Sequence, residues 1–135
     1  MKKFKKLIAV VLTVILSLSV MSVVAFASTT DSLKRTDDGT WLYMENGEHN
    51  ANYTGLVKYY DTWYYVENGV LNWDYTGPTE YYGTTYYVIK SILEWDYSSL
   101  VYVGDVWHYV ENGVYSNDYT GLTKYYGTWY YVEDG

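Results

Sequence analysis

Aromatic side chains are the most abundant groups in this sequence that could bind another molecule. The 135 residues include twenty Tyr and six Trp, but only two His and no Cys. Flat aromatic rings stack on sugar rings, and their faces attract quaternary ammonium ions. Two His provide little acid–base chemistry at neutral pH, and without Cys there is no disulfide, thiolate metal site or cysteine nucleophile. The residue types therefore predict a binding protein, not an enzyme, with no cofactor and no metal.

The Trp and Tyr residues recur in a 22-residue repeat. Four full units begin at Trp41, Trp63, Thr85 and Trp107, and a partial unit covers 129–135. Each unit opens with the triplet Trp-Tyr-Tyr, as at 63–65 and 129–131, or with a variant of it, and three units later contain Tyr-Thr-Gly. A fixed period of this length indicates a repeat architecture in which each unit packs on its neighbours.

Carboxylates also recur at repeat positions. They lie in the turns and before the loop tyrosines, at Glu45, Glu67, Glu111, Glu133, Asp74, Asp96 and Asp118. Their spacing differs from that of a calcium loop, and a solvated acidic surface that maintains solubility is the favoured interpretation. A catalytic carboxylate pair needs one distinct environment, whereas these residues occupy several similar ones.

Strand and turn signals alternate along each unit. Residues 124–126 and 129–132 are rich in aromatic and β-branched side chains, which favour strands, and Gly127-Thr128 between them predicts a type II′ hairpin turn. Asn-Gly pairs predict a second turn after the triplet, at 46–47, 68–69 and 112–113. These signals recur too often for a helix.

One hairpin is not stable alone in water, so the repeat predicts an all-β fold in which tandem β-hairpins stack as a solenoid. Alternation along a strand places Trp63 and Tyr65 on one face, and Tyr64 and Val66 on the other.

The N-terminal part differs in composition. Residues 1–27 contain four Lys, an apolar run and Ala-Phe-Ala, the pattern of a helical secretory signal peptide cleaved after Ala27. The alternative is an uncleaved membrane anchor, because the apolar run from Leu7 is 21 residues long. Cleavage would leave no stable membrane anchor, a polar linker at 28–40, and the repeats at 41–135. The mature net charge of −11 argues against a nucleic-acid partner and disfavours an anionic polymer.

The repeat resembles a known family. Residues 121–131, GLTKYYGTWYY, are similar to the cell-wall-binding repeats of Gram-positive bacteria, which include choline-binding and glucan-binding modules with the pattern G-W-x-x-x-x-G-x-W-Y-Y. Residues 55–65 and 77–87 match in the same register, and the resemblance covers the chain from Trp41. It implies a left-handed β-solenoid that holds its ligand between neighbouring hairpins, against three aromatic side chains.

The resemblance also implies which residues contact the ligand. They are the Trp that opens the triplet and its last Tyr: Trp41, Trp63, Trp107 and Trp129, with Tyr43, Tyr65, Tyr87, Tyr109 and Tyr131. The Trp of the G-W pair is replaced by Leu56, Pro78, Leu100 and Leu122, so another residue must supply the third wall. The candidates are Trp73, Trp95 and the loop tyrosines Tyr53, Tyr75, Tyr97 and Tyr119. A site that uses Thr85 should be weak or absent.

The function implied is that of a secreted, non-catalytic module, extracellular or cell-wall associated. Its partner would be either a glucan or a cell-wall polymer, namely choline-decorated teichoic acid. It would bind at several weak sites and gain avidity from multivalency. Two alternatives stay open: an adhesive repeat that docks another protein, and a fragment of a larger surface protein or wall hydrolase.

Overall fold

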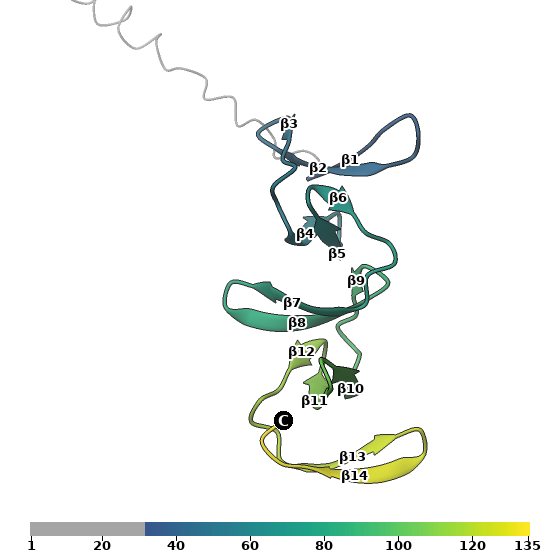
Figure 1. Ribbon diagram of the computed structural model, residues 1–135, viewed down its shortest axis with the longest axis vertical. Coiled ribbons are helices and arrows are strands. Elements are labelled where there is room, and N and C mark those ends of the chain that lie inside the picture. The colour runs from purple at the N-terminus through teal and green to yellow at the C-terminus, as the bar shows by residue number, and fades with distance from the viewer. Residues whose placement is uncertain (1–31) are drawn as a thin grey trace, which may run out of the picture. The chain divides into compact units, whose positions relative to one another are not determined.

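The computed structural model describes residues 32–135, which form antiparallel β-hairpins and contain no helix (Figure 1). The long strands are β1 (Leu33–Arg35), β2 (Trp41–Glu45), β4 (Gly55–Tyr59), β5 (Thr62–Glu67), β7 (Gly77–Tyr81), β8 (Thr84–Ile89), β10 (Ser99–Val103), β11 (Val106–Glu111), β13 (Gly121–Tyr125) and β14 (Thr128–Val132). Consecutive long strands pair as hairpins. The all-β prediction is therefore confirmed, whereas the predicted signal peptide lies outside the described residues.

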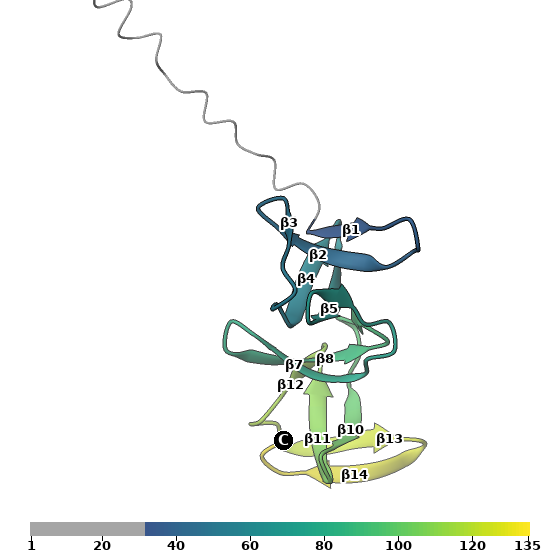
Figure 2. The ribbon, with the colours of Figure 1, turned by 45° about the horizontal axis from the view of Figure 1, so that its top comes forward.

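A short strand follows each of the first four hairpins, and all but the first of these strands join their hairpin to the one before it. They are β3 (Glu48–His49), β6 (Val70–Leu71), β9 (Ile92–Leu93) and β12 (Val114–Tyr115). After β5 the chain turns back, so that β6 pairs with β5 and also with β2 of the preceding hairpin. β9 and β12 repeat this arrangement, and together the pairings connect β1 to β12 in one twelve-stranded sheet. Neighbouring hairpins point in different directions along this series (Figure 2).

The turn after each triplet also links consecutive repeats. Gly69 accepts a hydrogen bond from the backbone N–H of Tyr43 and donates one to the carbonyl of Tyr53, both at 2.8 Å. The same two bonds recur every 22 residues, at Ser91, Gly113 and Gly135. These bonds tie every described repeat to the next one.

This linking position is sterically tight. The φ of Gly69 is +75°, and a Cβ there would lie 2.4 Å from the Asn50 carbonyl oxygen, closer than non-bonded atoms can approach. The third unit nevertheless has Ser91, with φ 70° and no exposed surface. Its hydroxyl donates a hydrogen bond to the Tyr65 carbonyl at 2.9 Å, an interaction that glycine cannot make.

The second predicted turn is confirmed, and the first is shifted by one residue. Asn68 and Gly69 both adopt positive φ, as the Asn-Gly signal requires. At the hairpin tip, however, Tyr125 pairs with Thr128, so the turn is Tyr126-Gly127, with φ 46° and 85°. Positive φ at both positions is the type I′ pattern, and not the type II′ turn that was predicted, in which only the first central residue has positive φ.

The alternation of the triplet separates two parts of the core. Val66 is fully buried with Leu33, Val57 and Leu71, and Tyr64 packs against this cluster. The other face of β5 contributes Tyr65 to a second cluster, against which Trp63 packs. The predicted two-faced strand is therefore present, and each face serves a different junction between hairpins.

One strand lies within the predicted polar linker. Residues 33–35 form β1 and pair with residues 41–43, and Leu33 is buried in the first core cluster. Thr36 and Asp38 close the turn, because the Thr36 hydroxyl lies within hydrogen-bond distance of both the Asp38 carboxylate and the Thr40 carbonyl. The polar composition of this stretch therefore did not predict the hairpin, although its single apolar side chain, Leu33, is enough to anchor the strand.

Candidate functional site

The opening Trp of a unit meets a Tyr from the next hairpin. Trp63 on β5 and Tyr81 at the end of β7 have ring centroids 5.0 Å apart in a T-shaped contact. Trp107 and Tyr125 repeat this contact at 5.2 Å, and Trp41 and Tyr59 at 5.4 Å. An edge-to-face contact leaves one aromatic face uncovered, so each pair can offer a ring surface to a ligand.

A second Tyr extends each of these pairs. Tyr82 follows Tyr81, with its ring 4.6 Å away and nearly perpendicular, and is 91% exposed. Tyr60 and Tyr126 occupy the same turn position and are also largely exposed. All three adopt positive φ, a conformation that is uncommon for large residues. A strained backbone that holds an exposed aromatic ring is typical of functional sites.

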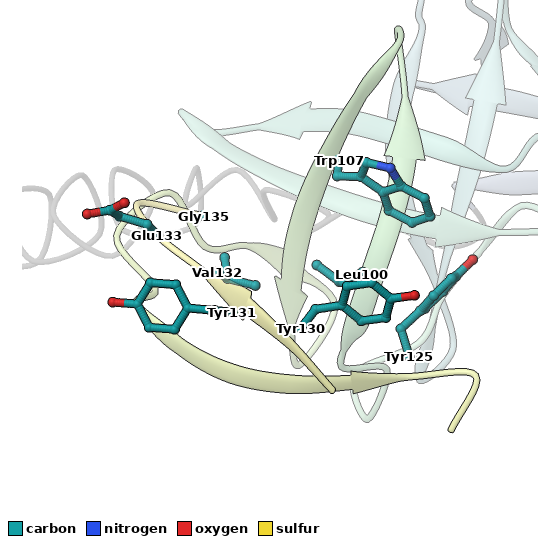
Figure 3. A pocket seen from close by; sticks show the side chains of 8 residues that line it. All are labelled: Leu100, Trp107, Tyr125, Tyr130, Tyr131, Val132, Glu133 and Gly135. Atoms are coloured by element: carbon teal, nitrogen blue, oxygen red, sulfur yellow. The ribbon is translucent and has the colours of Figure 1, made fainter. Parts of the chain in front are cut away.

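Grooves lie at two of these junctions, and three equivalent residues line both of them. The first groove is lined by Leu56, Trp63 and Tyr81, together with Tyr43, Tyr53 and Tyr82. The second is lined by Leu100, Trp107 and Tyr125, and by Tyr130, Tyr131 and Glu133 of the last hairpin (Figure 3). In Figure 3, Trp107 and Tyr125 lie at one end of the second groove, and Tyr131 and Glu133 at the other. Two copies of a Leu–Trp–Tyr set, two repeats apart, therefore line a groove each.

The intervening junction lacks all three aromatic rings. Thr85 stands in place of Trp63, Val103 in place of Tyr81, and Gly104 in place of Tyr82. The hairpin pairing itself is intact, since β7 pairs with β8 and β10 with β11 over five residues each. The junction therefore keeps the fold without the aromatic set.

In three repeats the last Tyr of the triplet stacks on a loop Tyr. The ring pairs Tyr65–Tyr75 and Tyr109–Tyr119 have centroids 3.7 and 3.9 Å apart, with small interplanar angles. Tyr65 and Tyr109 are buried, and the hydroxyl of Tyr75 donates to the Pro78 carbonyl. These contacts place the pairs mainly inside the protein. The predicted ligand role of Tyr43, Tyr65, Tyr75, Tyr87, Tyr109 and Tyr131 stays a prediction.

Burial changes the acidity of several of these phenols. It raises the pKa of Tyr53 to about 12, because loss of solvent disfavours the phenolate, with the nearby phenols of Tyr43, Tyr81 and Tyr82 adding smaller contributions. The Tyr53 hydroxyl donates to the Leu56 carbonyl at 2.6 Å, which holds its ring beneath Leu56 and Gly55. The Tyr53 phenol is therefore a neutral hydrogen-bonding group at physiological pH.

The candidates for the third wall lie elsewhere. Trp73 contacts Tyr64, and Trp95 contacts Tyr86, both in T-shaped pairs. Neither Trp lines the two grooves of the Leu–Trp–Tyr sets. The residues that sequence reasoning missed are Tyr81, Tyr82, Tyr125 and Tyr126. A signal was available in the sequence: in the third unit these two tyrosine positions and the opening Trp position all lose their aromatic residue together.

Trp129 belongs to the last hairpin and is 62% exposed, with the Lys124 ammonium 6.0 Å from its ring centre.

The described residues contain no group of three or more His or acidic side chains arranged to hold a metal ion. Over the same residues, the structure has no helix with the length and hydrophobicity needed to span a membrane.

Comparison with known proteins identifies the repeat. Three segments, residues 52–72, 96–114 and 118–135, match the family described as choline-binding repeat. The stretch between the first two matched segments contains Thr85. The curated proteins give no significant match.

Nine chains of solved structures match. One is choline binding protein F from Streptococcus pneumoniae, whose crystal structure was determined in the presence of a peptidoglycan analogue, a tetrasaccharide-pentapeptide. The alignment has 25% identity and a TM-score of 0.35, and it covers 76% of this chain and 32% of that protein. This chain therefore spans about a third of its length.

Proposed function

This chain belongs to the choline-binding type of cell-wall-binding repeat family, and from that premise we propose that it is a non-catalytic module that binds choline groups on a cell-wall polymer. The observation that carries the proposal is the repetition of the Leu–Trp–Tyr set. Leu56, Trp63 and Tyr81 line one groove, and their equivalents two repeats later line another.

The residue types suit a quaternary ammonium ion. Such an ion has no N–H group to donate and is held by the electron-rich faces of aromatic rings. Trp63 and Tyr81 supply two rings at an angle of 65°, and Tyr82 supplies a third. Leu56 stands where the family pattern has Trp, so one wall of the site is aliphatic.

Charge favours the same ligand. Glu45 and Glu80 line the first groove with a single basic residue, Lys58, and Glu133 lines the second. The excess of carboxylates attracts a cation and repels bare phosphate.

Each site alone should be weak. A cation over aromatic rings gains about 0.5 to 2 kcal/mol per ring, so three rings together contribute about 4 kcal/mol, which corresponds to a dissociation constant on the order of 1 mM. Two sites on one chain that bind one polymer raise the overall affinity through effective concentration.

Two finer statements belong to the same proposal. The hairpins wind as a solenoid, supported by the recurrence of the same inter-repeat hydrogen bonds every 22 residues. Residues 1–27 direct secretion and are removed after Ala27, so that the module acts outside the cell. N-terminal sequencing of protein recovered from the culture medium tests the second statement, and a first residue other than Ser28 would contradict it.

The binding experiment uses choline competition, because an acidic protein also binds a cationic resin non-specifically. The protein is loaded on a choline-bearing resin and eluted with choline chloride or with NaCl at the same concentration. We expect elution by choline at concentrations where NaCl leaves the protein bound. Equal elution by the two salts would refute choline recognition.

Matched variants locate the site. Trp63→Ala and Trp107→Ala should each weaken retention, and the double variant should abolish the choline-specific component. Thr85→Ala, at the same repeat position of the junction without aromatic rings, should leave retention unchanged. Sedimentation of the protein with insoluble glucan, but not with choline-bearing walls, would identify a glucan as the ligand instead.

A further inference from the structure

A third groove shares only Trp63 with the first choline site. It lies between the start of β5 and the loop that follows β9. Trp63, Tyr64 and Trp95 supply aromatic walls, and Asp61, Glu94 and Asp96 supply three carboxylates. Trp95 is 51% exposed, and all three acidic residues are exposed.

This combination is specific to one junction. One repeat earlier, the positions of the three carboxylates hold Gly39, Asn72 and Asp74, so a single acidic residue remains. One repeat later they hold Gly83, Ser116 and Asp118, again with one carboxylate, and Asn117 replaces Trp95. The three carboxylates therefore occur together at this junction and at neither of the two neighbouring ones.

The lining determines what kind of ligand fits. No Lys or Arg lines this groove, so its carboxylates favour a cation. Carboxylates also accept hydrogen bonds. A primary ammonium group has three N–H donors for them, whereas a quaternary ammonium group has none. The exposed face of Trp95 can cover the methylene chain that carries such a group.

We propose that this groove binds a primary ammonium group at the end of an aliphatic chain, as in the lysine side chain of a peptide. It is a second kind of site, distinct in chemistry from the two aromatic choline sites. The proposal stands on the groove's own residues and does not depend on choline binding elsewhere.

The test follows the indole N–H signal of Trp95 by NMR, assigned through its loss in Trp95→Phe. The protein is titrated with Nα-acetyl-lysine methylamide and, separately, with the uncharged Nα-acetyl-norleucine methylamide. We expect a saturable shift of the Trp95 signal with the lysine compound and at least a fivefold weaker response to the norleucine compound. Choline should move this signal less than the lysine compound does.

Charge variants supply the matched control. Asp96→Asn should weaken lysine binding up to about fivefold, the upper end for one exposed charge pair. Asp74→Asn removes the same charge at the same repeat position one unit earlier and should leave binding unchanged. The proposal is overturned if the two ligands act equally, if no shift occurs, or if Asp74→Asn weakens binding as much as Asp96→Asn.

A further variant separates this proposal from choline binding. Tyr81 lines the first choline groove and is absent from the lining of the third. Tyr81→Ala should therefore reduce choline retention and leave the lysine response of Trp95 intact. Loss of both responses in a folded variant would mean that one site had been counted twice, and would refute the assignment.

Discussion

Replacing the linking glycine of the second unit should open one junction between hairpins. In Gly69→Ser the new Cβ would lie 2.4 Å from the Asn50 carbonyl oxygen, so the turn must move away from it. Two hydrogen bonds, to Tyr43 and Tyr53, are then lost at about 1 kcal/mol each. The left-handed backbone adds about 1 kcal/mol for a residue with a Cβ, giving a total of about 3 kcal/mol.

The reverse change in the third unit should be mild. Ser91→Gly removes the hydrogen bond to the Tyr65 carbonyl, which costs about 1 kcal/mol. Glycine relieves about the same amount of left-handed strain, so the net change stays within about 1 kcal/mol. The same repeat position should therefore respond very differently in two neighbouring units.

Amide hydrogen exchange measures each junction locally, which suits a repeat protein whose units need not unfold together. The Tyr43 amide reports on Gly69, and the Tyr65 amide on Ser91, because each donates to that residue. We expect exchange at Tyr43 to accelerate about 100-fold in Gly69→Ser, and exchange at Tyr65 to change less than tenfold in Ser91→Gly. Acceleration below tenfold in the first variant, or equal effects in the two, would refute the reasoning.

The other predictions concern a buried phenol, alkaline pH and the junction without aromatic rings. The buried hydroxyl of Tyr115 has no hydrogen-bond partner among residues 32–135, so Tyr115→Phe should raise the free energy of unfolding by about 1 kcal/mol in urea titrations; a loss of stability would contradict this. Burial raises the pKa of both Tyr53 and Tyr115 to about 12. The contribution of this pKa difference to the free energy of unfolding is therefore fully present below pH 10 and is lost as pH rises toward 12. Thermal melts with phenolate absorbance should show a melting temperature that falls only above about pH 10; a fall beginning near neutral pH would exclude these phenols as its cause. Combining Thr85→Trp, Val103→Tyr and Gly104→Tyr should create a third choline site, since φ at Gly104 is 57° and the equivalent tyrosines have 46° to 51°. Calorimetric stoichiometry should then rise from two to three, and a value that stays at two would show that the rings alone do not make the site.

The repeat itself made much of the fold predictable. The 22-residue period and the Asn-Gly turns correctly indicated antiparallel hairpins, because both signals are local in sequence. The strand at Leu33–Arg35 was missed, since one buried Leu among polar residues gives no periodic signal. The tip turn was displaced by one residue because Tyr126 adopts positive φ, which its residue type does not suggest.

The site was less predictable than the fold. The opening Trp residues were predicted to contact the ligand, but their aromatic partners were not predicted, because Trp63 meets Tyr81 across a junction that depends on how successive hairpins stack. Composition alone also could not separate Tyr65, which is buried in a stack, from Tyr82, which is almost fully exposed. Residue type is identical in these cases, and only packing distinguishes the two environments.

The hydrogen bonds between repeats run in one direction, since each hairpin is completed by a residue that lies 26 positions later in the chain, as Tyr43 is by Gly69. During synthesis from the N-terminus, the inter-repeat backbone hydrogen bonds of a hairpin therefore form only after the turn of the following unit has been synthesised. Assembly would then advance one unit behind translation, and the newest hairpin would always be the least protected from proteases.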